Sequence, residues 1–143
     1  MLQPISVSAF PAELRQVFTN LITNAAEAAS PGGQVKVSIQ AQAARDPQTA
    51  GTDPTAQKMP AGATVTIADN GSGITAEVRP HLFQPFFTTK GERGTGLGLW
   101  VSRGIINKHG GTISLKSDTS EGAHGTVVSV FLATNPTISA GGA

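Results

Sequence analysis

The sequence predicts an α+β fold of two layers, in which about three helices pack against a mixed, mostly antiparallel sheet. Some stretches repeat apolar residues with the period of a helix, and others alternate apolar and polar residues as half-buried strands do. The length of 143 residues is that of one domain. We therefore expect a single unit over residues 1–143.

The first helix is the clearest element. Residues 5–10 alternate and are a candidate edge strand, which ends where Pro11 suits the first turn of a helix. Residues 12–29 then repeat apolar side chains at helical spacing until a Ser-Pro-Gly-Gly sequence stops the pattern. This part of the chain predicts an amphipathic helix after a short strand.

Strands and a loop follow the helix. Residues 34–40 and 63–69 alternate as half-buried strands. The stretch between them, from about 42 to 62, is rich in Ala, Gln, Thr, Asp and Pro. We interpret it as a long mobile loop that carries no site.

The second half of the chain predicts more helix and more sheet. Thr75 is a candidate N-cap of a short helix. A firmer helix is expected from about residue 96 to the glycine pair at 110–111. Residues 111–117 and 125–133 alternate as two further strands, and residues 134–143 are expected to form a frayed tail.

Composition excludes several kinds of function. Ten Lys and Arg nearly balance nine Asp and Glu, so the net charge of +1 gives no reason to expect nucleic acid or an anionic membrane as partner. The chain has no cysteine, which rules out disulfides, thiolate nucleophiles and Cys-ligated metals. No apolar run approaches the length of a membrane span, and the N-terminus lacks signal-peptide features. We expect this chain to be soluble.

Two asparagines occupy one strip of the first predicted helix. Asn20 and Asn24 are four residues apart, which places them about 40° apart around the helix axis. Asparagine is a poor residue for a helix interior, so the pair invites an explanation. Either the polar face simply uses asparagine, or the two carbonyl oxygens face a hard cation such as Mg²⁺.

A carboxylate and a glycine-rich turn follow the strand at 63–69. Asp69 ends the strand, and Asn70-Gly71-Ser72-Gly73 allows tight turns and close approach to a flat ligand. A carboxylate there accepts a hydrogen bond from an exocyclic amine such as that of adenine. The same sequence is also a common turn signal, so both interpretations stay open here.

A second glycine cluster, GTGLGL at residues 94–99, opens the later helix. Such a cluster leaves unpaired N–H groups that suit phosphate. It is neither a Walker A sequence nor a dinucleotide fingerprint. Before it, three phenylalanines within 83–87 are core or hinge candidates, and the polar residues after them include Lys90 and Arg93, whose charges suit phosphate.

The order of these motifs carries a family resemblance. N-x-x-x-N on a helix, D-x-G-x-G after a strand, F-x-x-F-F and G-x-G-x-G opening a helix closely resemble the N, G1, F and G2 boxes of the ATP-binding catalytic domain of sensor histidine kinases. The resemblance covers roughly residues 13–131. It implies the Bergerat fold, which holds ATP between the long helix and a flexible lid.

The resemblance also implies roles for single residues. Asn24 resembles the main Mg²⁺ ligand, and Asn20 assists at the metal or the phosphates. Asp69 resembles the carboxylate that reads adenine. Asn20 and Lys90 are the catalytic candidates, Lys90 as a γ-phosphate contact by its position alone. The other residues implied to contact ATP are Gly71, Gly73, Ile74, Thr88, Thr89, Gly94, Thr95, Gly96, Leu97, Gly98, Leu99 and Thr126.

One departure separates this chain from the related ATPases. Type II topoisomerases, heat-shock chaperones and mismatch-repair ATPases have a similar fold and usually carry a glutamate four residues before the metal-binding asparagine. That glutamate activates water, whereas Asn20 cannot act as a general base near neutral pH. The sequence therefore predicts poor ATP hydrolysis and a γ-phosphate kept for transfer.

The chain offers no obvious phosphate acceptor. His81, His109 and His124 all lack the sequence context in which the family phosphorylates histidine. We therefore expect the catalytic domain of a cytoplasmic two-component kinase, whose acceptor histidine lies on a dimerisation domain absent from this chain and whose next partner is a response regulator. The parent is either membrane-anchored or free. Two alternatives stay open: a degenerate nucleotide-binding or docking module without transfer, and an anti-sigma-type serine kinase.

Overall fold

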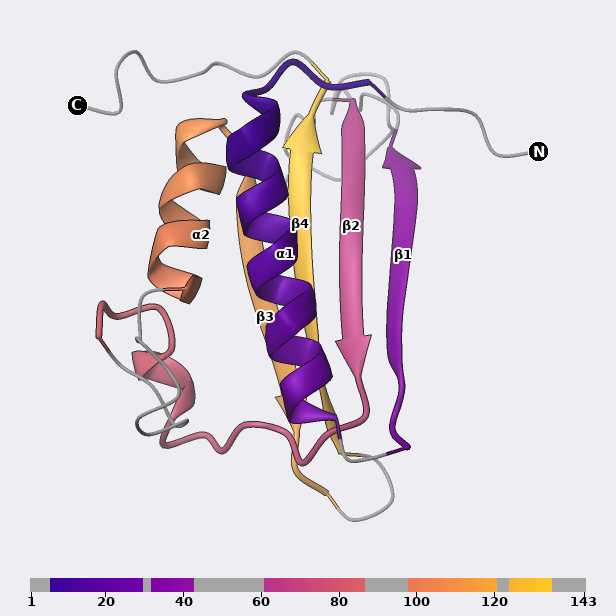
Figure 1. The fold of residues 1–143 in the computed structure, drawn as a ribbon, viewed down its shortest axis with the longest axis vertical. Helices are drawn as coiled ribbons and strands as arrows, with labels where there is room; N and C mark the ends of the chain where they lie inside the picture. Colours follow the sequence, from indigo (N-terminus) through magenta and orange to yellow (C-terminus); the bar gives the residue numbers. More distant parts are fainter. Residues whose placement is uncertain (1–5, 30–31, 43–60, 87–97, 121–123, 135–143) are drawn as a thin grey trace, which may run out of the picture.

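The computed structural model describes residues 6–29, 32–42, 61–86, 98–120 and 124–134. Its elements follow the predicted order (Figure 1). They are α1 (Pro11–Ala28), β1 (Val35–Gln42), β2 (Gly62–Asp69), the 3-10 helix η1 (Arg79–His81), α2 (Gly98–Lys108), β3 (Thr112–Asp118) and β4 (Gly125–Ala133). None of the helices in these ranges is long and apolar enough to cross a membrane.

The sheet has the strand order β1-β2-β4-β3. Every described pairing is antiparallel, so no parallel pair of the expected mixed sheet lies within these residues. Figure 1 shows α1 running in front of the sheet with α2 beside it. The predicted α+β class and its two layers are confirmed, with two α-helices and one 3-10 turn in the described part of the chain.

The core lies between the helices and one face of the sheet. Alternate side chains of β4 point to that face, which buries Val128, Val130 and Leu132. On α1 the buried residues follow helical spacing instead, and every fourth residue from position 17 to 25 is buried. The buried cluster comprises Val17, Leu21, Ala25, Ile67, Ile106, Val128, Val130 and Leu132.

The edge strand β1 departs from its predicted burial. Its alternation predicts a half-buried strand, yet Val37 and Ile39 are 48% and 62% exposed. They pair with Ile67 and Val65 of β2 and so share the helix-facing side of the sheet. The helices pack over β2, β4 and β3 and leave β1 largely uncovered (Figure 1). Of the predicted loop over 42–62, residues 43–60 lie outside the described residues, while Gln42 and Gly62 form the last pair of the ladder.

Two predicted short elements take other forms. Residues 6–10 form no strand, because Phe10 takes the N-cap position of α1 and its N–H donates to the His109 ring. The helix expected after Thr75 is a turn followed by η1. Pro80 has no N–H to donate and so cannot continue α-helical bonding. Of the predicted tail, residues 135–143 lie outside the described residues.

A buried histidine connects the start of α1 to the end of α2. His109 is 1% exposed, and its Nδ1 lies 2.8 Å from the carbonyl oxygen of Ile105. Its Nε2 accepts the N–H of Phe10 at 3.0 Å, and the two rings meet edge to face. Nδ1 must carry hydrogen to donate to the carbonyl, and Nε2 must keep its lone pair, so the ring is neutral. Both nitrogens therefore serve the fold.

His109→Ala is expected to lower the free energy of unfolding by about 2–4 kcal/mol, because it leaves a cavity and an unpaired Phe10 N–H. Urea denaturation followed by circular dichroism measures the change. His81→Ala is the matched control, since His81 is exposed, and its effect should stay within about 0.5 kcal/mol. Equal effects of the two substitutions would contradict the structural role of His109.

Candidate functional site

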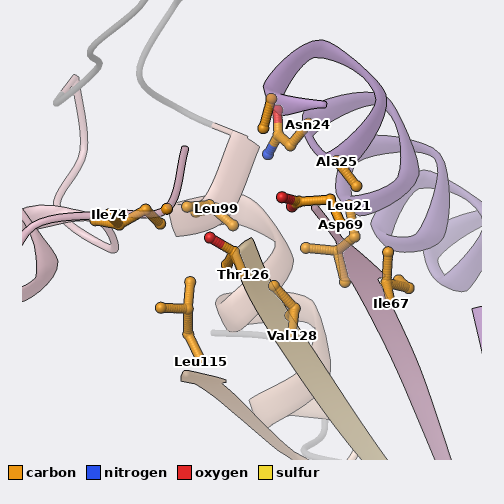
Figure 2. A pocket seen from close by; sticks show the side chains of 12 residues that line it. Leu21, Asn24, Ala25, Ile67, Asp69, Ile74, Leu99, Leu115, Thr126 and Val128 are labelled. Atoms are coloured by element: carbon orange, nitrogen blue, oxygen red, sulfur yellow. The ribbon is translucent and has the colours of Figure 1, made fainter. Parts of the chain in front are cut away.

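A pocket opens where the helices and the ends of the central strands meet. Its lining is mainly apolar, and Figure 2 shows the Asn24 carboxamide, the Asp69 carboxylate and the Thr126 hydroxyl directed into it. The lining residues are Leu21, Asn24, Ala25, Ala28, Ile67, Asp69, Gly73, Ile74, Leu99, Leu115, Thr126 and Val128. A few polar groups in an apolar pocket are typical of a small-molecule site.

Asp69 and Thr126 lie side by side at one end of the pocket. They are direct partners across β2 and β4. The Gly71 N–H donates to the Asp69 carboxylate Oδ1 at 2.9 Å, which fixes the carboxylate at the end of its strand. Thr126 is 6% exposed. A ligand that reaches this end therefore meets two oxygen-bearing side chains whose positions the sheet determines.

Two glycines let the turn after Asp69 pack closely against its neighbours. A Cβ on Gly71 would collide with the carbonyl oxygen of Ala28 at the end of α1. Gly73 has a φ of +83°, and a Cβ there would collide with the carbonyl oxygen of Asp118. Only glycine fits both requirements at position 73. The turn is thus held between α1 and the end of β3.

Residues outside the turn also hold it in place through hydrogen bonds. The Asn70 side-chain oxygen accepts the N–H of Gln34 at 2.9 Å. The Nδ1 of His124 bonds to the carbonyl oxygen of Gly71. A carboxylate just below the turn, Asp118, accepts hydrogen bonds from the side chain and backbone of Ser120, which lower its pKa. The bonds of Asn70 and His124 fix the turn that carries Asp69 into the pocket.

Ser117 is the centre of a hydrogen-bond network behind Thr126. Its Oγ accepts the Ile74 N–H at 2.6 Å, donates to the Gly125 carbonyl oxygen at 3.0 Å and lies 2.8 Å from the Thr126 Oγ1. The Arg79 guanidinium donates to the Ser117 carbonyl oxygen at 2.8 Å. Sequence reasoning missed Ser117, because only the register of β3 against β4 places it opposite Thr126.

The structure brings together only part of the predicted nucleotide site. Asn20 lies on α1 one turn before Asn24 and does not line the pocket, and neither does Gly98 at the start of α2. Gly71 contributes through its bond to Asp69. The predicted residues that do line the pocket are Asn24, Asp69, Gly73, Ile74, Leu99 and Thr126. The predicted residues outside the described part are Thr88, Thr89, Lys90, Gly94, Thr95, Gly96 and Leu97.

Apart from Ile74 and Leu99, the apolar lining was not predicted as part of the site. Leu21, Ile67 and Val128 belong to the buried core cluster and also line the pocket. Their periodic spacing in the sequence indicates burial but does not separate core from ligand contact. The pocket is therefore continuous with the core.

The fold resembles that of histidine kinases of known structure. The solved structures that resemble this chain include a mycobacterial sensor histidine kinase, MprB (TM-score 0.69, 28% identity, covering 92% of this chain and 76% of that one). The catalytic domain of the histidine kinase ThkA is also similar (TM-score 0.67, 31% identity, 91% and 72%). A family model described as histidine kinase-, DNA gyrase B-, and HSP90-like ATPase matches residues 10–136. The chain belongs to this family.

Relatives by sequence are sensor kinases. The sensor histidine kinase ZraS of Escherichia coli (strain K12) is 37% identical over 117 residues, which is 82% of this chain and 21% of that protein. The sensory histidine kinase/phosphatase NtrB of Rhizobium leguminosarum bv. phaseoli is 40% identical over 110 residues (76% and 28%). The resemblance to the catalytic domain of sensor histidine kinases is confirmed. The matched part of the chain thus spans less than a third of the length of either relative.

Gly73→Ala is expected to destabilise the fold by about 2 kcal/mol or more, through its positive φ and the collision with β3. Gly104→Ala is the matched control, because a Cβ added to Gly104 in α2 would meet no neighbouring side chain or strand within 4 Å. That change should instead stabilise by about 0.5–1 kcal/mol. Urea denaturation of the two variants tests the assignment, and a neutral Gly73→Ala would refute it.

Proposed function

We propose that this chain is the ATP-binding catalytic domain of a two-component sensor histidine kinase. It transfers the γ-phosphoryl group of ATP to a histidine on a dimerisation domain, from which an aspartate of a response regulator receives it. The observation that carries the proposal is the pair Asp69 and Thr126 at the end of an apolar pocket, with Asn24 directed into the same space (Figure 2). We propose that residues 1–143 act as one such domain in the cytoplasm, without contact to membrane or nucleic acid.

The apolar part of the pocket suits a flat heterocycle. Ile74 and Leu99 stand across from Asp69 (Figure 2), and apolar side chains of the core form the rest of the lining. The Asp69 carboxylate accepts a hydrogen bond from an exocyclic amine, which adenine carries. Burial of the base against these side chains supplies affinity, and Asp69 supplies orientation.

The phosphate end of the site is assigned to the asparagines of α1. Within the described residues no three His, Cys, Asp or Glu side chains gather as a metal site. Carboxamide oxygens suit Mg²⁺, which keeps waters and takes phosphate oxygens as further ligands, so the donor set fits. Asn24 would hold Mg²⁺ with Asn20 assisting, and the bound ion would offset the charge of the phosphates. Lys90, Gly94, Gly96 and their neighbours are proposed to contact the phosphates.

The residue at position 20 favours transfer of the γ-phosphoryl group over hydrolysis of ATP. The related ATPases place a glutamate there, and the amide of Asn20 cannot remove a proton from water near neutral pH. The reaction then depends on holding ATP in line with an incoming nucleophile and on stabilising the phosphate charge.

The histidines in the described ranges do not suit the role of acceptor. Both ring nitrogens of His109 are bonded inside the fold. His124 bonds to the turn at Gly71, and His81 contacts Gln84 on the surface. An acceptor histidine on a separate dimerisation domain fits these observations.

Asp69→Asn is expected to weaken ADP binding at least about tenfold, because the one oxygen of the amide is held by the Gly71 N–H and the NH₂ donor then faces the amine of adenine. Isothermal titration of ADP into the chain measures this. Asp118→Asn is the control, since it removes the same charge from an exposed carboxylate and should leave the affinity unchanged. An Asp69→Asn variant that binds ADP like the parent would rule out adenine reading by this residue.

Phosphoryl transfer to the parent kinase's dimerisation domain is expected to require Mg²⁺ and Asn24. We expect Asn24→Ala to lower the transfer rate at least about 100-fold by misplacing the phosphates. Asn107→Ala changes an exposed asparagine of α2 and serves as the control. Radiolabelled ATP follows the reaction, and an acid-labile, alkali-stable product identifies phosphohistidine. An acid-stable product would favour a serine kinase, and absence of any product would favour a binding module.

A further inference from the structure

Ser117 and Thr126 form a direct pair across β3 and β4, on the face of the sheet that carries the pocket. Thr126 lines the pocket, whereas Ser117 lies behind it. The Ser117 hydroxyl contacts the Ile74 N–H, the Gly125 carbonyl oxygen and the Thr126 hydroxyl. One side chain therefore connects the turn after Asp69, the start of β4 and a wall of the pocket.

Counting hydrogens assigns the direction of each bond. A serine hydroxyl has one hydrogen and two lone pairs. The Gly125 carbonyl only accepts, so it takes the hydrogen of Ser117, while the Ile74 N–H only donates and occupies a lone pair. The hydrogen between Ser117 and Thr126 must then come from Thr126. The Thr126 oxygen is left with lone pairs alone for any group inside the pocket.

The neighbour of Thr126 on β2 also offers only hydrogen-bond acceptors to the pocket. Asp69 pairs with Thr126 across β2 and β4, and its carboxylate only accepts hydrogen bonds. The polar end of the pocket is thus a surface of two acceptors. A ligand with an exocyclic amine matches that surface, whereas one with a carbonyl in the same place leaves acceptors facing each other.

We propose that Ser117 is a positioning residue that sets the base selectivity of the pocket. By taking the Thr126 hydrogen, it makes the site accept a 6-aminopurine and reject a 6-oxopurine. Ser117 contacts no base itself and acts through Thr126. The inference rests on the proposed nucleotide-binding function and adds to it the residue that decides between purines.

Titration of ADP and of inosine diphosphate into the whole chain tests this, because adenine carries an amine at position 6 and hypoxanthine a carbonyl, with the accompanying hydrogen on N1. The parent is expected to prefer ADP. In Ser117→Ala the Thr126 hydroxyl is released to donate into the pocket, so the preference should fall about tenfold, the equivalent of one hydrogen bond. Ser117→Thr keeps a hydroxyl and should keep the preference.

A second pair of variants, made in a chain that carries Thr126→Val, separates this role of Ser117 from a purely structural one. In Thr126→Val the hydroxyl that Ser117 directs is gone, so adding Ser117→Ala should not change the ratio of the two affinities further. A loss of structure alone would weaken both ligands by the same factor and leave the ratio intact, which would overturn the proposal. If Ser117→Ala does not fold, Ser117→Cys keeps a side chain of similar shape whose sulfur is only a weak acceptor for the Thr126 hydrogen, and it carries the same test.

The outcomes distinguish the inference from the function on which it rests. If the parent binds ADP selectively and Ser117→Ala keeps the full preference, the role of Ser117 is refuted while the nucleotide site stands. If the folded parent binds neither nucleotide, both the proposed function and this inference are wrong.

Discussion

The position of β4 between β2 and β3 is the constraint on which the site depends. Its antiparallel register places Thr126 directly between Asp69 on one side and Ser117 on the other. Because side chains alternate along a strand, a slip of one residue would turn Thr126 to the opposite face and bury the wrong set of side chains. The residues that fill the core, Val128 and Val130 among them, therefore also fix the row of polar groups at the end of the pocket.

Within the described residues, the pocket lies where α1, α2 and the strands of the sheet meet. Leu21, Ile67 and Val128 belong to the buried core, and their side chains also line the cavity. A ligand that fills it would extend the core and would stabilise the folded state by binding to it alone. The glycine turn makes this geometry possible, since side chains at Gly71 and Gly73 would push it away from α1 and β3. The side chains that stabilise the fold at this point are therefore also those that a ligand would contact.

Much of this arrangement is predictable from sequence, but only where a period or a turn signal reports it. Helical spacing predicts α1, and alternation predicts the four strands, because both follow from one-sided burial. Burial of β1 was overestimated, since alternation does not show how far a helix layer reaches. Asp69 was found through its turn sequence, whereas Ser117 depends on strand register, which no local pattern encodes. Asn20 shares a helical strip with Asn24, yet one turn along the axis is enough to take it out of the pocket lining.

The two ends of the proposed site are held by different parts of the fold. Hydrogen bonds hold the base end. The Gly71 N–H bonds to the Asp69 carboxylate, and the Thr126 hydroxyl bonds to that of Ser117, which in turn bonds to the Ile74 N–H and the Gly125 carbonyl oxygen. The phosphate end is assigned to side chains of α1, where Asn20 stands outside the lining of the pocket. On the proposed function, we therefore expect a change at position 20 to alter the fate of the γ-phosphate without disturbing recognition of the base. In the proposed site, the helix would thus decide between hydrolysis and transfer, while the sheet would hold the base.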